Sequence, residues 1–94
     1  MSAAFVYVLG SARAGEKRTY VGWTVDLDQR LAAHNAGRGA RSTRGRTWML
    51  LYAERHATRS EAMRREVALK RDRKLRAALA LLIAPLASCI EEAA

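Results

Sequence analysis

Three short apolar runs in this chain are typical of strands. Residues 5–9 are apolar on both alternating faces, which predicts a central strand covered on two sides. Residues 18–23 return after the turn-rich stretch 10–17 and predict the second strand of an antiparallel hairpin. Residues 48–53 are again apolar on both faces and predict a third strand.

Helical spacing separates and follows these strands. Leu27, Leu31 and His34 fall on one face of a helix that Asp26 is placed to cap and that ends near 35–37. Thr58 and Glu61 have the spacing of a capping box.

The second helical pattern starts at about Ser60 and ends at Pro85, with a break expected near 71–73. Its apolar positions keep helical spacing and are expected to face the core: Met63, Val67, Leu75, Leu79 and Leu82.

The order β-β-α-β-α(-α) predicts an α/β (α+β) fold, a small sandwich with a three-stranded antiparallel sheet flanked by helices. With 94 residues, half of them hydrophobic, the chain is expected to form one domain. The core should span about 4–83 and the tail 84–94.

Composition excludes several classes of protein. Cys89 is the only cysteine, so a disulfide scaffold is excluded. With only His34 and His56 beside it, a four-ligand zinc site is not expected. No basic region precedes the first apolar run, and the run 77–84 is too short to cross a bilayer. We therefore expect a cytoplasmic protein with no membrane partner.

The charge is concentrated in the middle of the chain. The formal net charge is +8, while residues 30–76 alone hold 14 bases and four acids. Such a block attracts a polyanion, with nucleic acid the first candidate and an anionic membrane surface the second. Arginine outnumbers lysine, which suits paired contacts to phosphate oxygens. The base composition of the gene could equally explain that ratio, but it does not explain the net charge.

Five features along the chain resemble the GIY-YIG nuclease superfamily, in particular its small stand-alone bacterial members. They are Tyr7, the run Tyr20-Val21-Gly22, Arg30, His34 and Glu66. Two departures stand out. Phe5-Val6 replaces the Gly-Ile of the first half-motif, and the twelve residues between Tyr7 and Tyr20 predict a longer hairpin loop.

The resemblance implies a metal-dependent endonuclease that cleaves DNA, with a role in DNA repair or recombination. One of Tyr7 and Tyr20, helped by His34, would take the proton of the attacking water, and the resemblance leaves open which. Arg30 would steady the phosphate, and Glu66 would bind one Mg²⁺ or Mn²⁺.

The residues themselves agree with these implied roles. Arg30 and His34 are four residues apart on one helix face, so their side chains can reach one point. Glu66 lies beside the apolar face, and a single carboxylate suits Mg²⁺, which keeps much of its water shell. Gly22 would let backbone or substrate approach the strand closely. The alternatives are core packing for the tyrosines and a salt bridge to Arg65, Lys70 or a neighbour for Glu66. For Arg30 the alternative is a solvated side chain, for His34 a place at the edge of the core, and for Gly22 an edge kink.

The expected nucleic-acid contacts lie in the basic loop and on the long helix. They are Arg38, Arg41, Arg44, Arg46 and Lys70. No base-reading element is evident, so contacts to the DNA backbone should dominate and sequence preference should be small. RNA is not excluded as a substrate, and targeting could come from a protein partner.

A non-catalytic nucleic-acid-binding module is the main alternative. Many members of the superfamily carry an Asn on the last helix, where this chain has Ala77-Ala78. Trp23 stands where some members have a Lys, and it could stack on a base or pack in the core. A protein of the membrane surface fits less well, because the bases lie on a loop and two helices without an amphipathic anchor.

Overall fold

A three-stranded antiparallel sheet forms the middle of the molecule. The structure, a computed structural model, describes residues 3–83. The strands are β1 (Ala4–Arg13), β2 (Glu16–Thr24) and β3 (Met49–His56), in the order β2-β1-β3. Both neighbours pair antiparallel with β1. The first apolar run is therefore the central strand, as its pattern predicts.

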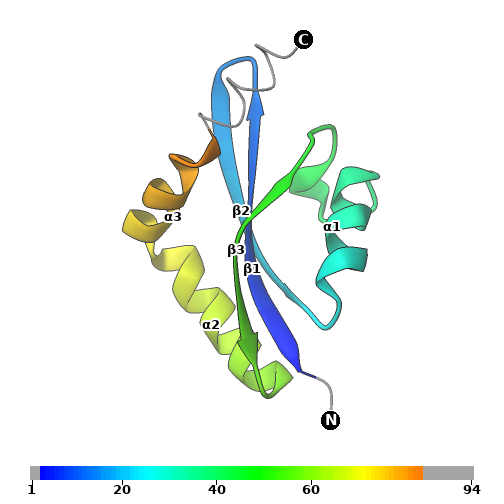
Figure 1. The fold of residues 1–94 in the computed structure, drawn as a ribbon, viewed down its shortest axis with the longest axis vertical. Coiled ribbons are helices and arrows are strands. Elements are labelled where there is room, and N and C mark those ends of the chain that lie inside the picture. The colour runs from blue at the N-terminus through cyan, green and yellow to red at the C-terminus, as the bar shows by residue number, and fades with distance from the viewer. Residues whose placement is uncertain (1–2, 84–94) are drawn as a thin grey trace.

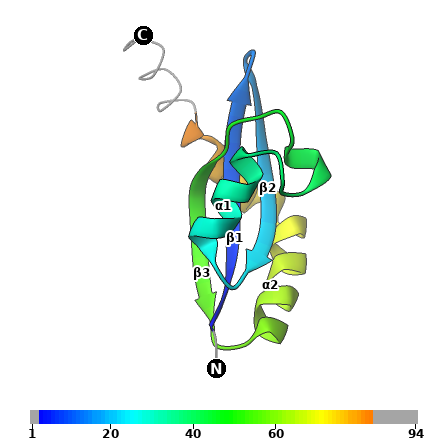
Figure 2. The same cartoon turned by 90° about the vertical axis from the view of Figure 1, so that its right-hand side faces the viewer.

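Helices cover both faces of the sheet (Figure 1). Helix α1 (Leu27–Asn35) lies on one face, and α2 (Arg59–Arg71) and α3 (Arg73–Ala80) lie on the other. A short 3-10 helix, Arg41–Thr43, lies in the connection from α1 to β3 (Figure 2). The predicted α+β sandwich and its element order are confirmed. In the described part of the chain no helix is long and apolar enough to cross a membrane.

Two apolar clusters lie on opposite faces of β1. Val6 and Val8 point toward α2 and pack with its Leu69, whereas Tyr7 and Leu9 point toward α1 and pack with Trp48. Alternate residues of an extended strand point to opposite faces, so one strand supplies both clusters. This alternation places Tyr7 on the α1 side.

The β1–β2 hairpin is longer and its loop shorter than the sequence suggests. Pairing continues to Arg13 and Glu16, so only Ala14 and Gly15 form the turn. Both have positive φ (52° and 80°), as a tight two-residue hairpin turn requires. The prediction of a longer loop is wrong, because the extra residues extend the two strands instead.

The helix ends follow the predicted signals. The side chain of Asp26 accepts the N–H of Gln29 at 3.0 Å, and that of Thr58 accepts the N–H of Glu61 at 3.2 Å. A break at Asp72 separates α2 from α3, as expected. Pro85, the predicted helix end, lies outside the described residues.

The prediction of which residues of this helical region face the core is only partly correct. Met63 and Val67 are half exposed, and Leu82, beyond α3, is 49% exposed. Ala62 and Leu69 are buried instead. Small Ala62 lets the helix lie close to the sheet, which rotates the larger apolar side chains outward.

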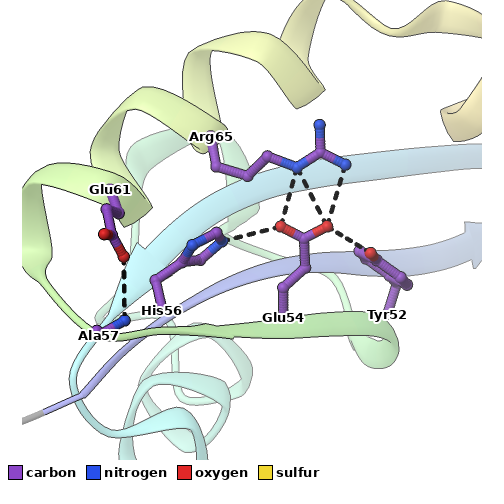
Figure 3. Close-up of polar contacts among 6 residues, drawn as sticks. All are labelled: Tyr52, Glu54, His56, Ala57, Glu61 and Arg65. Carbon is purple, nitrogen blue, oxygen red and sulfur yellow. Dashed lines mark hydrogen bonds and ion pairs between the residues drawn. The ribbon is translucent and has the colours of Figure 1, made fainter.

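A partly buried ion pair joins β3 to α2 (Figure 3). Arg65 donates to both carboxylate oxygens of Glu54 at 2.9 and 3.0 Å. His56 and the hydroxyl of Tyr52 bond to the same carboxylate. The Arg65 guanidinium holds the pKa of Glu54 at about 2, well below its usual range. Glu54 is therefore ionised throughout the physiological range.

Glu54→Gln is expected to lower the free energy of unfolding by roughly 1–3 kcal/mol at pH 7. The folded carboxyl has a depressed pKa, so its contribution is complete above the unfolded pKa of 4.5 and disappears as the pH falls toward 2. Urea unfolding of variant and wild type at pH 7 and pH 3 measures the difference. An equal difference at both pH values contradicts the assignment.

Candidate functional site

A hydrogen bond between Tyr7 and His34 lies at the centre of the candidate site. Tyr7 comes from β1 and His34 from the last turn of α1, and their side chains are 1% and 0% exposed. The Tyr7 hydroxyl is 2.9 Å from Nε2 of His34. The bond therefore joins the sheet to α1 in a place that water does not reach.

Thr43, in the 3-10 helix, determines which nitrogen of His34 carries the proton. Its hydroxyl donates to the carbonyl of Ala40 at 2.7 Å, so its lone pair accepts from Nδ1 of His34 at 2.8 Å. Nε2 is then the unprotonated nitrogen and accepts from Tyr7. Burial and, secondarily, the charge of Arg30 lower the pKa of His34, which keeps the ring neutral.

Two glycines make room for these side chains. A Cβ at Gly22 would lie 2.6 Å from the Tyr7 hydroxyl, and a Cβ at Gly39 would lie 2.2 Å from Nδ1 of His34. The close approach expected at Gly22 is present, and the group that approaches is the side chain of Tyr7. Any larger residue at either position would displace the Tyr7–His34 pair.

Tyr20 lies on the same face as Tyr7 but is more accessible. Its ring centroid is 4.9 Å from that of His34 and 6.4 Å from that of Tyr7. It is partly buried, and within residues 3–83 its hydroxyl makes no hydrogen bond. The two tyrosines therefore differ: the Tyr7 hydroxyl is engaged internally, and that of Tyr20 is free to meet a ligand.

Charged groups on two helices act on Tyr7. Burial raises the pKa of the Tyr7 hydroxyl, Arg30 opposes this, and the charge of Glu66 adds to the increase. Arg30 lies on α1, and its buried Nε has no hydrogen-bond partner in the described structure. The net increase in pKa keeps Tyr7 a neutral phenol, which suits its role as donor to His34.

Glu66 lies on the sheet-facing stripe of α2. It is four residues after buried Ala62 and three before buried Leu69, and its side chain is 20% exposed. Its carboxylate forms an ion pair with Lys70, in which Oε1 of Glu66 and Nζ of Lys70 are 3.3 Å apart. The alternative of a salt bridge to Lys70 is therefore present, while Arg65 is engaged elsewhere.

A metal site at Glu66, as the sequence predicts, would have to rely on one carboxylate. Among residues 3–83 no three His, Cys, Asp or Glu side chains lie together as potential ligands. Glu66 would therefore be a lone carboxylate ligand, as Mg²⁺ and Mn²⁺ accept when water and substrate oxygens complete the shell.

Of the five residues predicted to contact nucleic acid, three are exposed and two make contacts within the protein. Arg38, Arg41 and Arg44 are exposed. Arg46 donates to Ser11 Oγ at 3.2 Å and to the carbonyl of Glu16 at 3.1 Å. It therefore fastens the basic loop to the hairpin. Lys70 pairs with Glu66.

Sequence reasoning missed three contributors: Thr43, Gly39 and Asn35. Asn35 accepts from the backbone N–H of Trp48 at 2.6 Å and donates to its carbonyl at 3.1 Å, joining the end of α1 to the start of β3. Trp48 is 4% exposed, so it packs in the core. A buried Thr inside a basic loop has no distinct local signal, because its partner is nine residues away.

The fold and the site together define a class of protein. A small α+β domain brings Tyr7, Tyr20 and His34 together on the α1 face of its sheet, with Arg30 and Glu66 acting on the pKa of Tyr7, in a strongly basic chain.

Comparison with known proteins specifies the family. The family model described as "GIY-YIG catalytic domain" matches residues 3–77. The chain is similar to a UPF0213 protein of Streptococcus pneumoniae serotype 4, 44% identical over 72 residues that cover 76% of this chain and 70% of that protein. A UPF0213 protein of Natronomonas pharaonis is 43% identical over 67 residues, 70% of this chain and 75% of that protein. No solved structure gives a significant match. The chain belongs to the GIY-YIG family, a superfamily of nucleases.

Thr43→Val is expected to remove the acceptor for Nδ1 of His34 and to lower the free energy of unfolding by about 1–3 kcal/mol. The ¹⁵N shifts of the imidazole should show that the Nδ1–H form no longer dominates. Thr43→Ser keeps the hydroxyl and should leave both properties unchanged. His56, on the other face of the sheet, should not respond. Unchanged His34 shifts in the Val variant would show that Thr43 does not set the tautomer.

Proposed function

We propose that this protein is a metal-dependent nuclease that hydrolyses phosphodiester bonds in DNA with little intrinsic sequence preference. The observation that carries the proposal is the convergence around Tyr7. His34 bonds to its hydroxyl at 2.9 Å and the ring centroid of Tyr20 lies 6.4 Å from its own. Arg30 of α1 and Glu66 of α2 also act on the pKa of Tyr7. A tyrosine, a cation and a carboxylate are the groups that phosphodiester hydrolysis needs at one point.

Tyr20 is the proposed proton acceptor. Its hydroxyl is free in the described structure, whereas that of Tyr7 is buried and bonded to His34. As phenolate, Tyr20 would take a proton from the attacking water. The water oxygen then bonds to phosphorus, the opposite phosphorus–oxygen ester bond breaks, and the leaving oxygen takes a proton from solvent.

Tyr7, His34 and Thr43 act as positioning residues in this proposal. Both ring nitrogens of His34 are engaged, at 2.9 and 2.8 Å, so the ring is held in one orientation. Tyr20 packs against that ring. The contribution expected from His34 is therefore structural: its ring is fixed by two hydrogen bonds and in turn fixes the orientation of Tyr20.

Arg30 is the proposed phosphate ligand. Its Nε is buried without a protein partner, and it lines an open hollow with Trp23, Thr24, Val25 and Arg59. A buried guanidinium N–H without an acceptor is unfavourable, and a phosphate oxygen would satisfy it. The hollow offers a second cation in Arg59.

Glu66 would hold the divalent cation, with Lys70 as its partner when the metal is absent. A bound ion would neutralise charge that develops on the phosphoryl oxygens. The ion pair with Lys70 joins groups of which one is 55% exposed, so a metal could displace the ammonium at small cost.

Glu66→Gln is expected to lower DNA cleavage by roughly two orders of magnitude or more, because the charge that binds the metal is lost. The measurement uses labelled single-stranded, duplex and branched DNA with Mg²⁺, Mn²⁺ or EDTA. Glu61→Gln, on the exposed side of the same helix, is the matched control and should cleave like wild type.

Two outcomes of this experiment decide between the functions. Cleavage that persists in Glu66→Gln contradicts the metal role. If the wild-type protein binds all three DNA forms and cuts none, it is a non-catalytic nucleic-acid-binding module. The Glu66–Lys70 ion pair would then have a structural role.

Tyr20→Phe is expected to reduce cleavage by about 100-fold or more with little change in melting temperature, since its hydroxyl makes no hydrogen bond to any of residues 3–83. Tyr7→Phe should lower the melting temperature as well, because it leaves Nε2 of His34 unpartnered in the core. Cleavage rates and thermal unfolding of both variants separate the two roles. A Tyr20→Phe variant with wild-type cleavage would rule Tyr20 out as the proton acceptor.

A further inference from the structure

A second basic hollow lies beside β2, on the side away from α1. It is open to solvent and is lined by Lys17 and Thr19 of β2 and by Arg73, Arg76, Ala77 and Ala80 of α3. Three bases therefore face one space. Arg73 and Arg76 belong to the basic helical residues that the sequence already suggests for nucleic acid, whereas Lys17 does not, and the structure brings the three together.

The bases of this hollow have no acidic partner within residues 3–83. The ion pairs of that part involve other side chains, and the nearby carboxylate of Asp72 caps α3 by accepting the N–H of Leu75 at 3.0 Å. Three like charges around one space repel each other, and an anion relieves that repulsion. The hollow is therefore suited to a negatively charged ligand.

Arg76 strengthens this interpretation. Its Nε is buried and has no hydrogen-bond partner, a property that in the described structure it shares with Arg30 of the candidate site. A buried donor without an acceptor carries an unmet desolvation cost. A phosphate oxygen in the hollow would accept from it, as proposed for Arg30.

The two hollows lie toward opposite ends of β2. One includes Thr24 and Arg30, and the other includes Lys17 and Arg76. Seven residues of strand separate Lys17 from Thr24, or roughly 23 Å at about 3.3 Å per residue. This length corresponds to about seven nucleotides of one strand at about 3.4 Å each.

We propose that the hollow of Lys17, Thr19, Arg73 and Arg76 binds a backbone phosphate of the nucleic-acid strand, several nucleotides away from the phosphate held by Arg30. The inference rests on the proposed function in taking nucleic acid as the anion. An anionic membrane is less suitable, since the hollow has no exposed apolar side chain larger than alanine along its lining.

The test compares Lys17→Gln/Arg73→Gln with the control Arg55→Gln/Arg64→Gln. All four residues are exposed, both double variants lose two charges, and the control residues do not line the hollow. Binding of a labelled single-stranded oligonucleotide of about 12 nucleotides is measured against salt, with EDTA present so that cleavage plays no part.

The slope of log K against log salt should be shallower by about 0.7 in the hollow variant, for the loss of one phosphate contact, and nearly unchanged in the control. A fourfold rise in salt would then weaken the variant roughly 2.6-fold less than wild type. An oligonucleotide of about four nucleotides, too short to reach both hollows, should not distinguish the variants.

Equal changes in the two double variants would overturn the proposal, because diffuse charge would explain the binding. Failure of the wild type to bind the oligonucleotide would overturn it too, as would an unchanged slope with loss of binding only to anionic phospholipid vesicles. Absence of cleavage in a separate Mg²⁺ assay would overturn the nuclease proposal alone and leave the slope result standing.

Discussion

The fully buried hydrogen-bond chain from Tyr7 through His34 to Thr43 is the constraint on which the rest of the site depends. Buried polar groups that water cannot reach need hydrogen-bond partners within the protein, and the side chains of Tyr7, His34 and Thr43 all have them. The chain crosses three segments: the central strand, α1 and the 3-10 helix. Because the loss of any member leaves a buried polar group unmatched, these segments can pack together in one arrangement only. Because Gly22 and Gly39 have no side chains, they leave the space that Tyr7 and His34 occupy.

That buried chain also explains why two similar tyrosines have different roles. Alternation along β1 and the pairing with β2 bring Tyr7 and Tyr20 to the same face. Tyr7 lies on the central strand and is buried between the sheet and α1, while Tyr20 lies on the edge strand and stays accessible. Residues of β2 line both proposed phosphate sites: Trp23 and Thr24 beside Arg30, and Lys17 and Thr19 beside Arg76.

Much of the fold could be predicted because its signals are local. Asp26 and Thr58 cap helices through bonds to residues three positions away, and the break near Asp72 follows from nearby sequence. The failures have non-local causes. Met63 and Val67 have the right spacing for a core face, but the small side chain of Ala62 lets α2 lie with another face toward the sheet. Gly10 to Lys17 looks like a loop, yet cross-strand pairing makes most of it strand.

The sequence by itself determined the architecture, the family resemblance and the five features that carry it, because spacing of residue types along strands and helices is enough to place them near one another. Only the tertiary structure decided which tyrosine is accessible, which nitrogen of His34 is protonated, and that Arg46 holds the basic loop to the hairpin. Those properties depend on burial and on partners nine to thirty-five residues away, and no local pattern encodes such contacts.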